Sequence, residues 1–228
     1  ELTSRISKVG FAGLNDEEKK QLGEVDFQLK EHRDYWYERL AKLQPAFDRS
    51  SGKGTITAGN ASPLTDGAAG LWVATGAGLK RLPGRLPRAR LVDWEVAAVN
   101  VFTEGLLMAP AYAIPRMLAR NRLGYGDIAL WEIHEAFAAQ VLCNVAALES
   151  RDFRRQNAGV DADLGKFPME RLNPNGGSTA LGHPFGATGA RILSQAVKAL
   201  AAMPKGSRAI VSICADGGQG TVALLEAA

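Results

Sequence analysis

Three side chains that can move a proton or attack a carbonyl lie in the second half of the chain, namely His134, His183 and Cys214. His183 stands between Gly182 and Pro184, just before a long apolar run, where a rigid turn would hold an imidazole ready for proton transfer. Cys214 ends an apolar run, and a thiol near an imidazolium can act as acid, base or nucleophile. These residue types allow acid–base or nucleophilic chemistry.

Glycines surround these side chains. Residues 173–191 read NPNGGSTALGHPFGATGAR and contain five glycines, which let backbone come close to a ligand or to another backbone. The turn after Cys214, ADGGQG, exposes backbone N–H groups that could stabilise an oxyanion. Neither stretch carries the GK[ST] of a phosphate loop or the spacing of a dinucleotide fingerprint. The histidines and cysteines show no HxxxH or CxxC spacing, so no metal site is predicted.

Composition narrows the class of protein. The 228 residues include 27 Lys and Arg against 24 Asp and Glu, a net charge of +3 without the basic stripe of a nucleic-acid binder. Most of the excess positive charge lies in residues 80–90. This stretch is either a solvated surface or a patch that attracts an anionic ligand such as a nucleotide phosphate. Two cysteines indicate a reducing compartment. No apolar run reaches the roughly 18 residues of a membrane span, and no signal peptide is visible.

The apolar pattern divides the chain into a polar lead-in, residues 1–53, and a domain over residues 54–228. In the lead-in, Trp36, Leu40 and Leu43 have the spacing of an amphipathic helix. The domain is predicted to alternate strands and helices, and residues 150–171 are expected to form an irregular surface excursion. Cys143 is expected to be a buried core residue in the middle of a helix that starts at the HEAF motif. The expected strands cover 90–102, 126–133, 208–214 and 221–227. A short β-branched strand is also expected between residue 54 and a turn at 59–60, followed by an apolar segment at about 68–73. The expected helices cover 76–82, 110–121, 134–148 and 188–203. The fold class is therefore α/β, a mixed sheet covered by helices and ending in a β-hairpin.

Four stretches in fixed order, from about residue 26 onward, resemble the C-terminal half of a thiolase. They are TAGNAS with DGAA (57–62 and 66–69), HEAF (134–137), GHP (182–184) and the glycine-rich turn 214–220. HEAF resembles the NEAF motif of the family in its His-bearing form, found in trifunctional-enzyme-type β-oxidation thiolases. The resemblance implies an acetyl-CoA acyltransferase that cleaves or condenses 3-ketoacyl-CoA through a covalent acyl-enzyme.

The resemblance also implies roles. His183 would activate a nucleophilic cysteine, Cys214 would move the α-proton of the second acyl group, and His134 with His183 would polarise a thioester oxygen. Ser62 and Phe137 would line the pantetheine channel. CoA and acyl-CoA are implied as substrates, with no permanently bound cofactor. The resemblance further implies a homo- or hetero-oligomer in a bacterial cytoplasm, mitochondrion or peroxisome.

Two departures from the family pattern leave alternatives open. Asp216 stands where the terminal motif usually has glycine; its backbone N–H could serve an oxyanion hole, while its carboxylate could repel an enolate. No segment matches the part of the family that carries the nucleophilic cysteine, so a missing N-terminal half or a partner chain is expected to supply it. The alternatives are a catalytically silent acyl-CoA-binding or structural subunit, and a Cys/His hydrolase that uses Cys214 itself.

Overall fold

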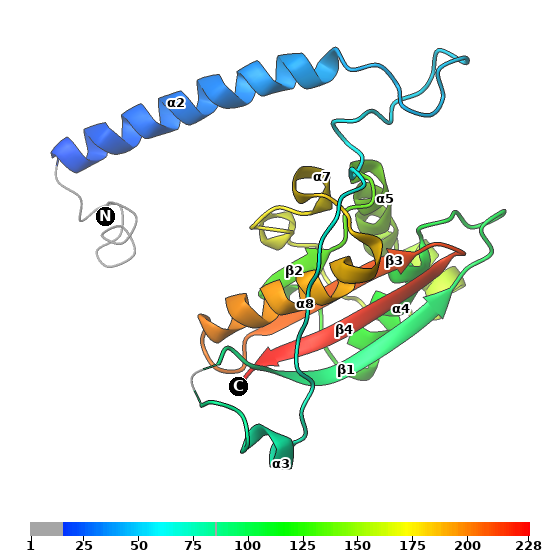
Figure 1. Cartoon of the computed structure of the whole chain (residues 1–228). Coiled ribbons are helices and arrows are strands. Elements are labelled where there is room, and N and C mark those ends of the chain that lie inside the picture. The colour runs from blue at the N-terminus through cyan, green and yellow to red at the C-terminus, as the bar shows by residue number, and fades with distance from the viewer. Residues whose placement is uncertain (1–15, 85) are drawn as a thin grey trace. The chain divides into compact units, whose positions relative to one another are not determined.

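The computed structural model describes residues 16–84 and 86–228, and the expectations for residues 1–15 and Arg85 lie outside it. The chain divides into two compact units, residues 1–59 and 60–228. In the first unit, helix α2 (Asp16–Ala41) is much longer than the amphipathic pattern predicts, and an antiparallel bridge pairs Pro45 with Thr57 (Figure 1). Trp36, Leu40 and Leu43 are exposed. The short strand expected after residue 54 is wrong, because only the isolated bridge at Thr57 forms in that stretch.

One mixed sheet forms the centre of the second unit, with the strand order β1-β4-β3-β2 (Figure 1). The strands are β1 Ala89–Ala98, β2 Leu130–Ile133, β3 Arg208–Ala215 and β4 Gln219–Ala227. β3 and β4 form an antiparallel hairpin, β1 pairs antiparallel with β4, and β2 pairs parallel with β3. The predicted mixed sheet with a closing hairpin is confirmed. β2 is shorter than expected because Tyr125–Asp127 form a 3-10 turn, η2.

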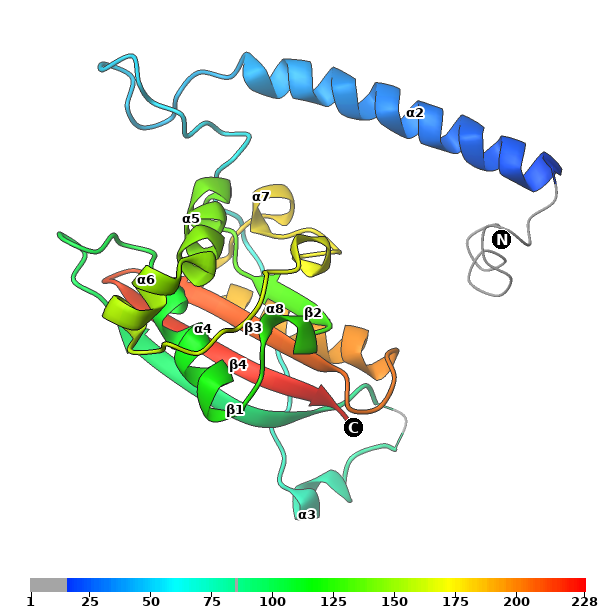
Figure 2. The same ribbon diagram turned by 180° about the vertical axis from the view of Figure 1, so that it is seen from behind.

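Helices cover both faces of this sheet, as the two opposite views show (Figures 1 and 2). α4 (Ala109–Arg120) and α5 (Ala138–Glu149) pack on one face, and α8 (Phe185–Ala201) packs on the other. Side chains of a strand alternate between faces, so Ile210 enters the α4 and α5 core while Ala209 and Val211 enter the α8 core. Two four-residue helices, α3 (Gly76–Leu79) and α7 (Ser178–Leu181), complete the unit with the short turns of residues 150–171.

Helix α5 begins four residues later than predicted. Residues 134–137 stay extended because their backbone pairs with residues 60–62, and the Ala138 N–H donates to the carbonyl of Asn60. The core face of α5 then consists of Val141, Val145 and Leu148. Cys143 lies on the opposite face and is exposed, so the expectation of a core cysteine is wrong.

Residues 150–171 contain more structure than a surface excursion. They form α6 (Arg151–Phe153), a π-helical turn η3 (Arg154–Ala158) and a 3-10 turn η4 (Met169–Arg171). Phe167 is buried, and its ring lies 4.7 Å from that of Trp131 on β2. The segment thus covers one end of the core. None of the helices within the described ranges is both long and apolar enough to span a bilayer.

Candidate active site

A single extended segment, residues 60–64, joins the two loops that carry the histidines. On one side the Ser62 N–H donates to the carbonyl of Ala136, at 2.9 Å. On the other side the His183 N–H donates to the carbonyl of Pro63, also at 2.9 Å. The TAGNAS, HEAF and GHP motifs, distant in sequence, therefore share one hydrogen-bonded backbone cluster.

The two predicted histidines lie against each other in this cluster. The ring centroids of His134 and His183 are 4.3 Å apart, with 45° between the ring planes. His134 is only 2% exposed, whereas His183 is half-buried and also contacts the ring of Phe185, at 4.5 Å. The structure thus brings together the imidazoles of two separate loops, one following β2 and one preceding α8.

His134 is held as a neutral imidazole. Its Nδ1 lies 3.2 Å from the Ser178 hydroxyl, which in turn accepts a hydrogen bond from Arg191 Nη2 at 2.8 Å. Burial, and then the positive charges of His183 and Arg191, lower the pKa of His134 to about 3. Its Nε2 is buried and makes no hydrogen bond within the described residues. A ligand atom could therefore pair with this nitrogen.

His183 is oriented by a different hydroxyl. Its Nδ1 lies 2.8 Å from Thr188 Oγ1, and the Thr188 hydroxyl donates to the carbonyl of Pro184 at 3.1 Å. Because that hydroxyl has one hydrogen, Nδ1 is the donor in the His183 pair and Nε2 keeps its lone pair. Burial and then Arg191 hold the pKa of His183 below its ordinary value. A neutral imidazole with a free Nε2 can accept a proton from a nucleophile.

The loop between the two histidines is fixed by Glu135 and Asn173, neither of which the sequence singled out. Glu135 accepts from the Asn173 amide at 2.7 Å and from the Thr179 N–H and hydroxyl at 3.2 and 2.6 Å. Asn173 also bonds to both backbone groups of Ile133. A Cβ on Gly177 would overlap the Glu135 carboxylate. The pair of glycines in NPNGGS was the available signal for this close approach.

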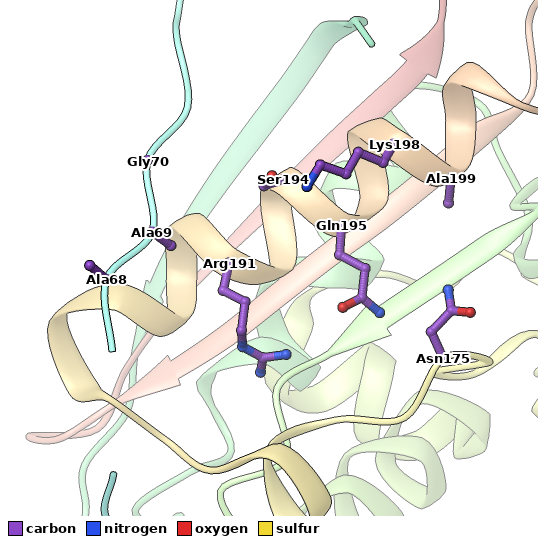
Figure 3. Close-up of a pocket in the computed structure, with 9 residues that line it drawn as sticks. All are labelled: Ala68, Ala69, Gly70, Asn175, Arg191, Ser194, Gln195, Lys198 and Ala199. Carbon is purple, nitrogen blue, oxygen red and sulfur yellow. The ribbon is translucent and has the colours of Figure 1, made fainter. Parts of the chain in front are cut away.

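Next to the histidines, α8 presents a polar face that the sequence also left unassigned. Buried Glu132 on β2 accepts from Gln195 at 3.2 Å, and burial raises the pKa of its carboxyl to about 7. Beside them is a hollow of about 620 Å³, and residues 68–70 form part of its lining (Figure 3). Neither histidine lines it. Its lining residues are Ala68, Ala69, Gly70, Asn175, Arg191, Ser194, Gln195, Lys198 and Ala199.

Cys214 lies near the histidines along the sheet but is not joined to them. The His134 N–H donates to the carbonyl of Ser212, two residues before Cys214 and therefore about 7 Å back along β3. In the described structure the thiol makes no hydrogen bond to either imidazole. Burial raises the pKa of the Cys214 thiol to about 11, so it is protonated at neutral pH.

The remaining predicted residues fall into two groups. Ser62 and Phe137 are half-buried, and an antiparallel bridge between Ala61 and Phe137 places them beside the histidine loops. Asp216 is exposed in the β3–β4 turn, where its carboxylate accepts from the Gly217 N–H at 2.8 Å. The carboxylate therefore already occupies one N–H group of the turn that was expected to form an oxyanion hole.

The mixed sheet, together with the two histidines on the HEAF and GHP loops, defines the class of protein. Two family models match this chain. The thiolase C-terminal domain matches residues 85–227, and the thiolase N-terminal domain matches residues 14–77. The chain belongs to the thiolase family.

Known proteins agree with this assignment. The chain is 41% identical over 203 residues to a 3-ketoacyl-CoA thiolase of Photobacterium profundum, covering 89% of this chain and 45% of that protein. It is 41% identical over 190 residues to a probable 3-ketoacyl-CoA thiolase of Caenorhabditis elegans, covering 83% and 41%. The chain thus spans less than half the length of these relatives.

Solved structures are similar over the same share of their chains. The Acat5 thiolase from Ascaris suum in complex with coenzyme A gives a TM-score of 0.64 at 31% identity, covering 84% of this chain and 44% of that one. Human mitochondrial 3-ketoacyl-CoA thiolase in complex with CoA gives 0.64 at 30% identity, covering 84% and 42%. The α/β fold is therefore that of the thiolases.

Proposed function

We propose that this chain supplies the proton-transfer part of a thiolase active site, for thiolytic cleavage or Claisen condensation of 3-ketoacyl-CoA. The observation that carries the proposal is the contact between His134 and His183, with both Nδ1 atoms held by hydroxyl groups. Each ring then turns its Nε2 to a reacting group. The CoA complexes of the structural neighbours support CoA and acyl-CoA as the substrates of this chain.

The histidines have complementary roles in this proposal. His183 Nε2 takes the thiol proton of a nucleophilic cysteine, which a segment or chain outside these 228 residues supplies. The sulfur then attacks the 3-keto carbon of the substrate. His134 is neutral and donates from Nε2 to the acyl oxygen, where negative charge develops. Ser62 and Phe137 line the path of the pantetheine arm.

Cys214 moves the α-proton. In cleavage, the bond between C2 and C3 breaks, its electron pair remains on C2, and the Cys214 thiol gives C2 a proton to release acetyl-CoA. A raised thiol pKa suits this direction, since the thiol is fully protonated at neutral pH. In condensation the resulting thiolate takes the proton back from the methyl group of a second acetyl-CoA. The backbone of Asp216 would face the same thioester.

The proposal extends to the biological setting of the chain, through its membership of the thiolase family. The chain works in a homo- or hetero-oligomer with the part that carries the nucleophile. The two free cysteines support a reducing compartment. A bacterial cytoplasm, mitochondrion or peroxisome is such a compartment, and there the chain would serve fatty-acid β-oxidation.

The proposal can be tested on this chain alone, because α-proton exchange needs no nucleophilic cysteine. Acetyl-CoA in D₂O is followed by proton NMR with and without the protein, and binding is measured separately by calorimetry. We expect the methyl signal to decay, faster at higher pH as more Cys214 thiolate forms. Cys214→Ala should abolish exchange, whereas the matched control Cys143→Ala, at an exposed site on α5, should not.

The other outcomes identify the alternatives. Binding of acetyl-CoA without exchange would support a silent acyl-CoA-binding subunit. Intact-mass spectrometry after brief exposure to a short 3-ketoacyl-CoA separates the hydrolase, because an acyl group on Cys214 would make that thiol the nucleophile. Acyl mass on a co-purified chain or on an upstream extension would support the thiolase.

A further inference from the structure

We propose that Ser178 and Arg191 together are positioning residues that fix His134 as its Nε2–H tautomer and so present an N–H to the acyl oxygen of the substrate. The use of that N–H rests on the proposed function. The tautomer itself is a property of this chain and does not depend on turnover. Neither residue was assigned a role from the sequence, although both belong to the glycine-rich stretch 173–191.

The Ser178 hydroxyl determines which nitrogen of His134 carries the hydrogen. Ser178 has no exposed surface, and among the described residues its Oγ makes two hydrogen bonds, one with Arg191 and one with His134 Nδ1. A guanidinium has donors and no acceptor, so Nδ1 is the only partner able to accept the hydroxyl hydrogen. If Nδ1 carried the hydrogen instead, a buried O–H would be left without a partner.

Arg191 reinforces this direction of donation. Its Nη2 lies 2.8 Å from Ser178 Oγ, so one lone pair of the oxygen faces a positive charge and the hydroxyl hydrogen turns toward the imidazole. The same positive charge opposes protonation of His134. Arg191 Nε and Nη1 are buried and make no hydrogen bond to any of the described residues, so the hydrogen bond to Ser178 is the one that the structure gives this guanidinium. Arg191 acts on the site through Ser178 and does not itself reach His134 by a hydrogen bond in the described structure.

The consequence is a pair of imidazoles with opposite hydrogen placement. His134 offers a hydrogen from Nε2, whereas His183 has its hydrogen on Nδ1 and a lone pair on Nε2. One ring can stabilise a developing oxyanion while its neighbour, at 4.3 Å, accepts the proton of a nucleophile. Two hydroxyl groups, on Ser178 and Thr188, thus give two identical side chains different functions.

The test is long-range ¹H–¹⁵N NMR of the ¹⁵N-histidine-labelled chain at neutral pH, which reports the protonated nitrogen of each ring. The chain has three histidines, and His134→Asn and His183→Asn variants assign their signals. In the wild-type protein we expect the Nε2–H form of His134 to exceed the Nδ1–H form by about tenfold or more. In Ser178→Ala this preference should fall to within about threefold of equal populations, and in Arg191→Met it should be weakened.

Thr179→Val is the matched control, because Thr179 is the next residue of α7 and its hydroxyl donates to Glu135 rather than to His134. This variant should keep the wild-type tautomer. A wild-type His134 with its hydrogen on Nδ1, or an unchanged tautomer in Ser178→Ala, would overturn the proposal. Should Ser178→Ala fail to fold, the wild-type spectrum and Arg191→Met still decide. Because acetyl-CoA exchange is measured separately, its loss with the tautomer intact would count against the proposed function alone.

Discussion

The ring centroids of His134 and His183 lie 4.3 Å apart, and this proximity is imposed by the backbone of a third segment. The backbone of residues 60–64 forms hydrogen bonds with both histidine-bearing loops. These bonds fix the distance between the two loops independently of side-chain packing. Substitutions that disturb this backbone cluster should move the imidazoles relative to each other without touching either ring.

Gly182→Ala is such a substitution. Gly182 has a φ of +96°, and a Cβ there would overlap Thr65 in the segment that pairs with the GHP loop. We expect the free energy of unfolding to fall by about 2 kcal/mol or more, measured by urea denaturation. Gly186→Ala is the control, since Gly186 lies in α8 with open space around its Cβ, and it should be neutral or stabilising by up to about 1 kcal/mol. Equal losses in both variants would contradict this account of the loop.

The two cysteines should differ strongly in reactivity toward a thiol reagent such as DTNB. Cys143 is exposed on α5, whereas Cys214 is buried and burial raises the pKa of its thiol to about 11. At about pH 8 we expect Cys214 to react about 100-fold more slowly than Cys143. The Cys143→Ser variant should show only the slow phase and Cys214→Ser only the fast one. A fast phase that survives in Cys143→Ser would mean that the Cys214 thiol is accessible or activated.

Much of the fold could be predicted from local pattern. The apolar runs of β3 and β4 alternate between two cores, and the glycine-rich turn between them predicts the hairpin. The two histidines could be selected because each lies beside small residues at the end of an element. These features depend on neighbours in sequence, and their strand and turn propensities agree with the final structure.

The errors have a common cause, which is contact with distant residues. HEAF has a helical pattern, but its backbone is taken up by residues 60–62, and α5 begins only at Ala138. Phe167 lies in a polar stretch, and its burial is explained by the distant rings of Trp131 and Tyr125. Ser178 is 44 residues away from its partner His134 in the chain, and Arg191 reaches the pair only through Ser178. Single-sequence periodicity carries no information on such pairs.

Phe167→Ala tests whether the 150–171 segment is part of the core. Phe167 is 1% exposed and its ring contacts those of Trp131 and Tyr125. We expect the free energy of unfolding to fall by about 3–5 kcal/mol, measured by urea denaturation with tryptophan fluorescence. Phe102→Ala is the matched control, because that side chain is 93% exposed and its loss should change stability by less than about 0.5 kcal/mol. A small effect of Phe167→Ala would mean that residues 150–171 are a surface segment and not part of the core.

Glu132→Gln should change how stability depends on pH. Burial raises the pKa of this carboxyl from 4.5 to about 7 in the folded chain. Between those values the folded state binds more protons than the unfolded state, so this group lowers the free energy of unfolding as pH rises through the window. The amide cannot titrate and keeps an oxygen for the hydrogen bond from Gln195. Between about pH 5 and about pH 8, the free energy of unfolding of the variant should rise relative to that of the wild type by on the order of 1–3 kcal/mol.

The measurement is the difference in unfolding free energy between the two proteins at each pH, which isolates the carboxyl from the other titrating groups. His134 has the opposite sign: its folded pKa of about 3 lies below its ordinary 6.5, so its contribution to stability declines as pH falls. That contribution is common to both proteins and largely cancels in the difference. Glu170→Gln, at an exposed carboxylate on η4, is the matched control and should give a flat difference. A flat difference for Glu132→Gln as well would mean that this carboxyl is ionised throughout the window, with Arg191 compensating its burial.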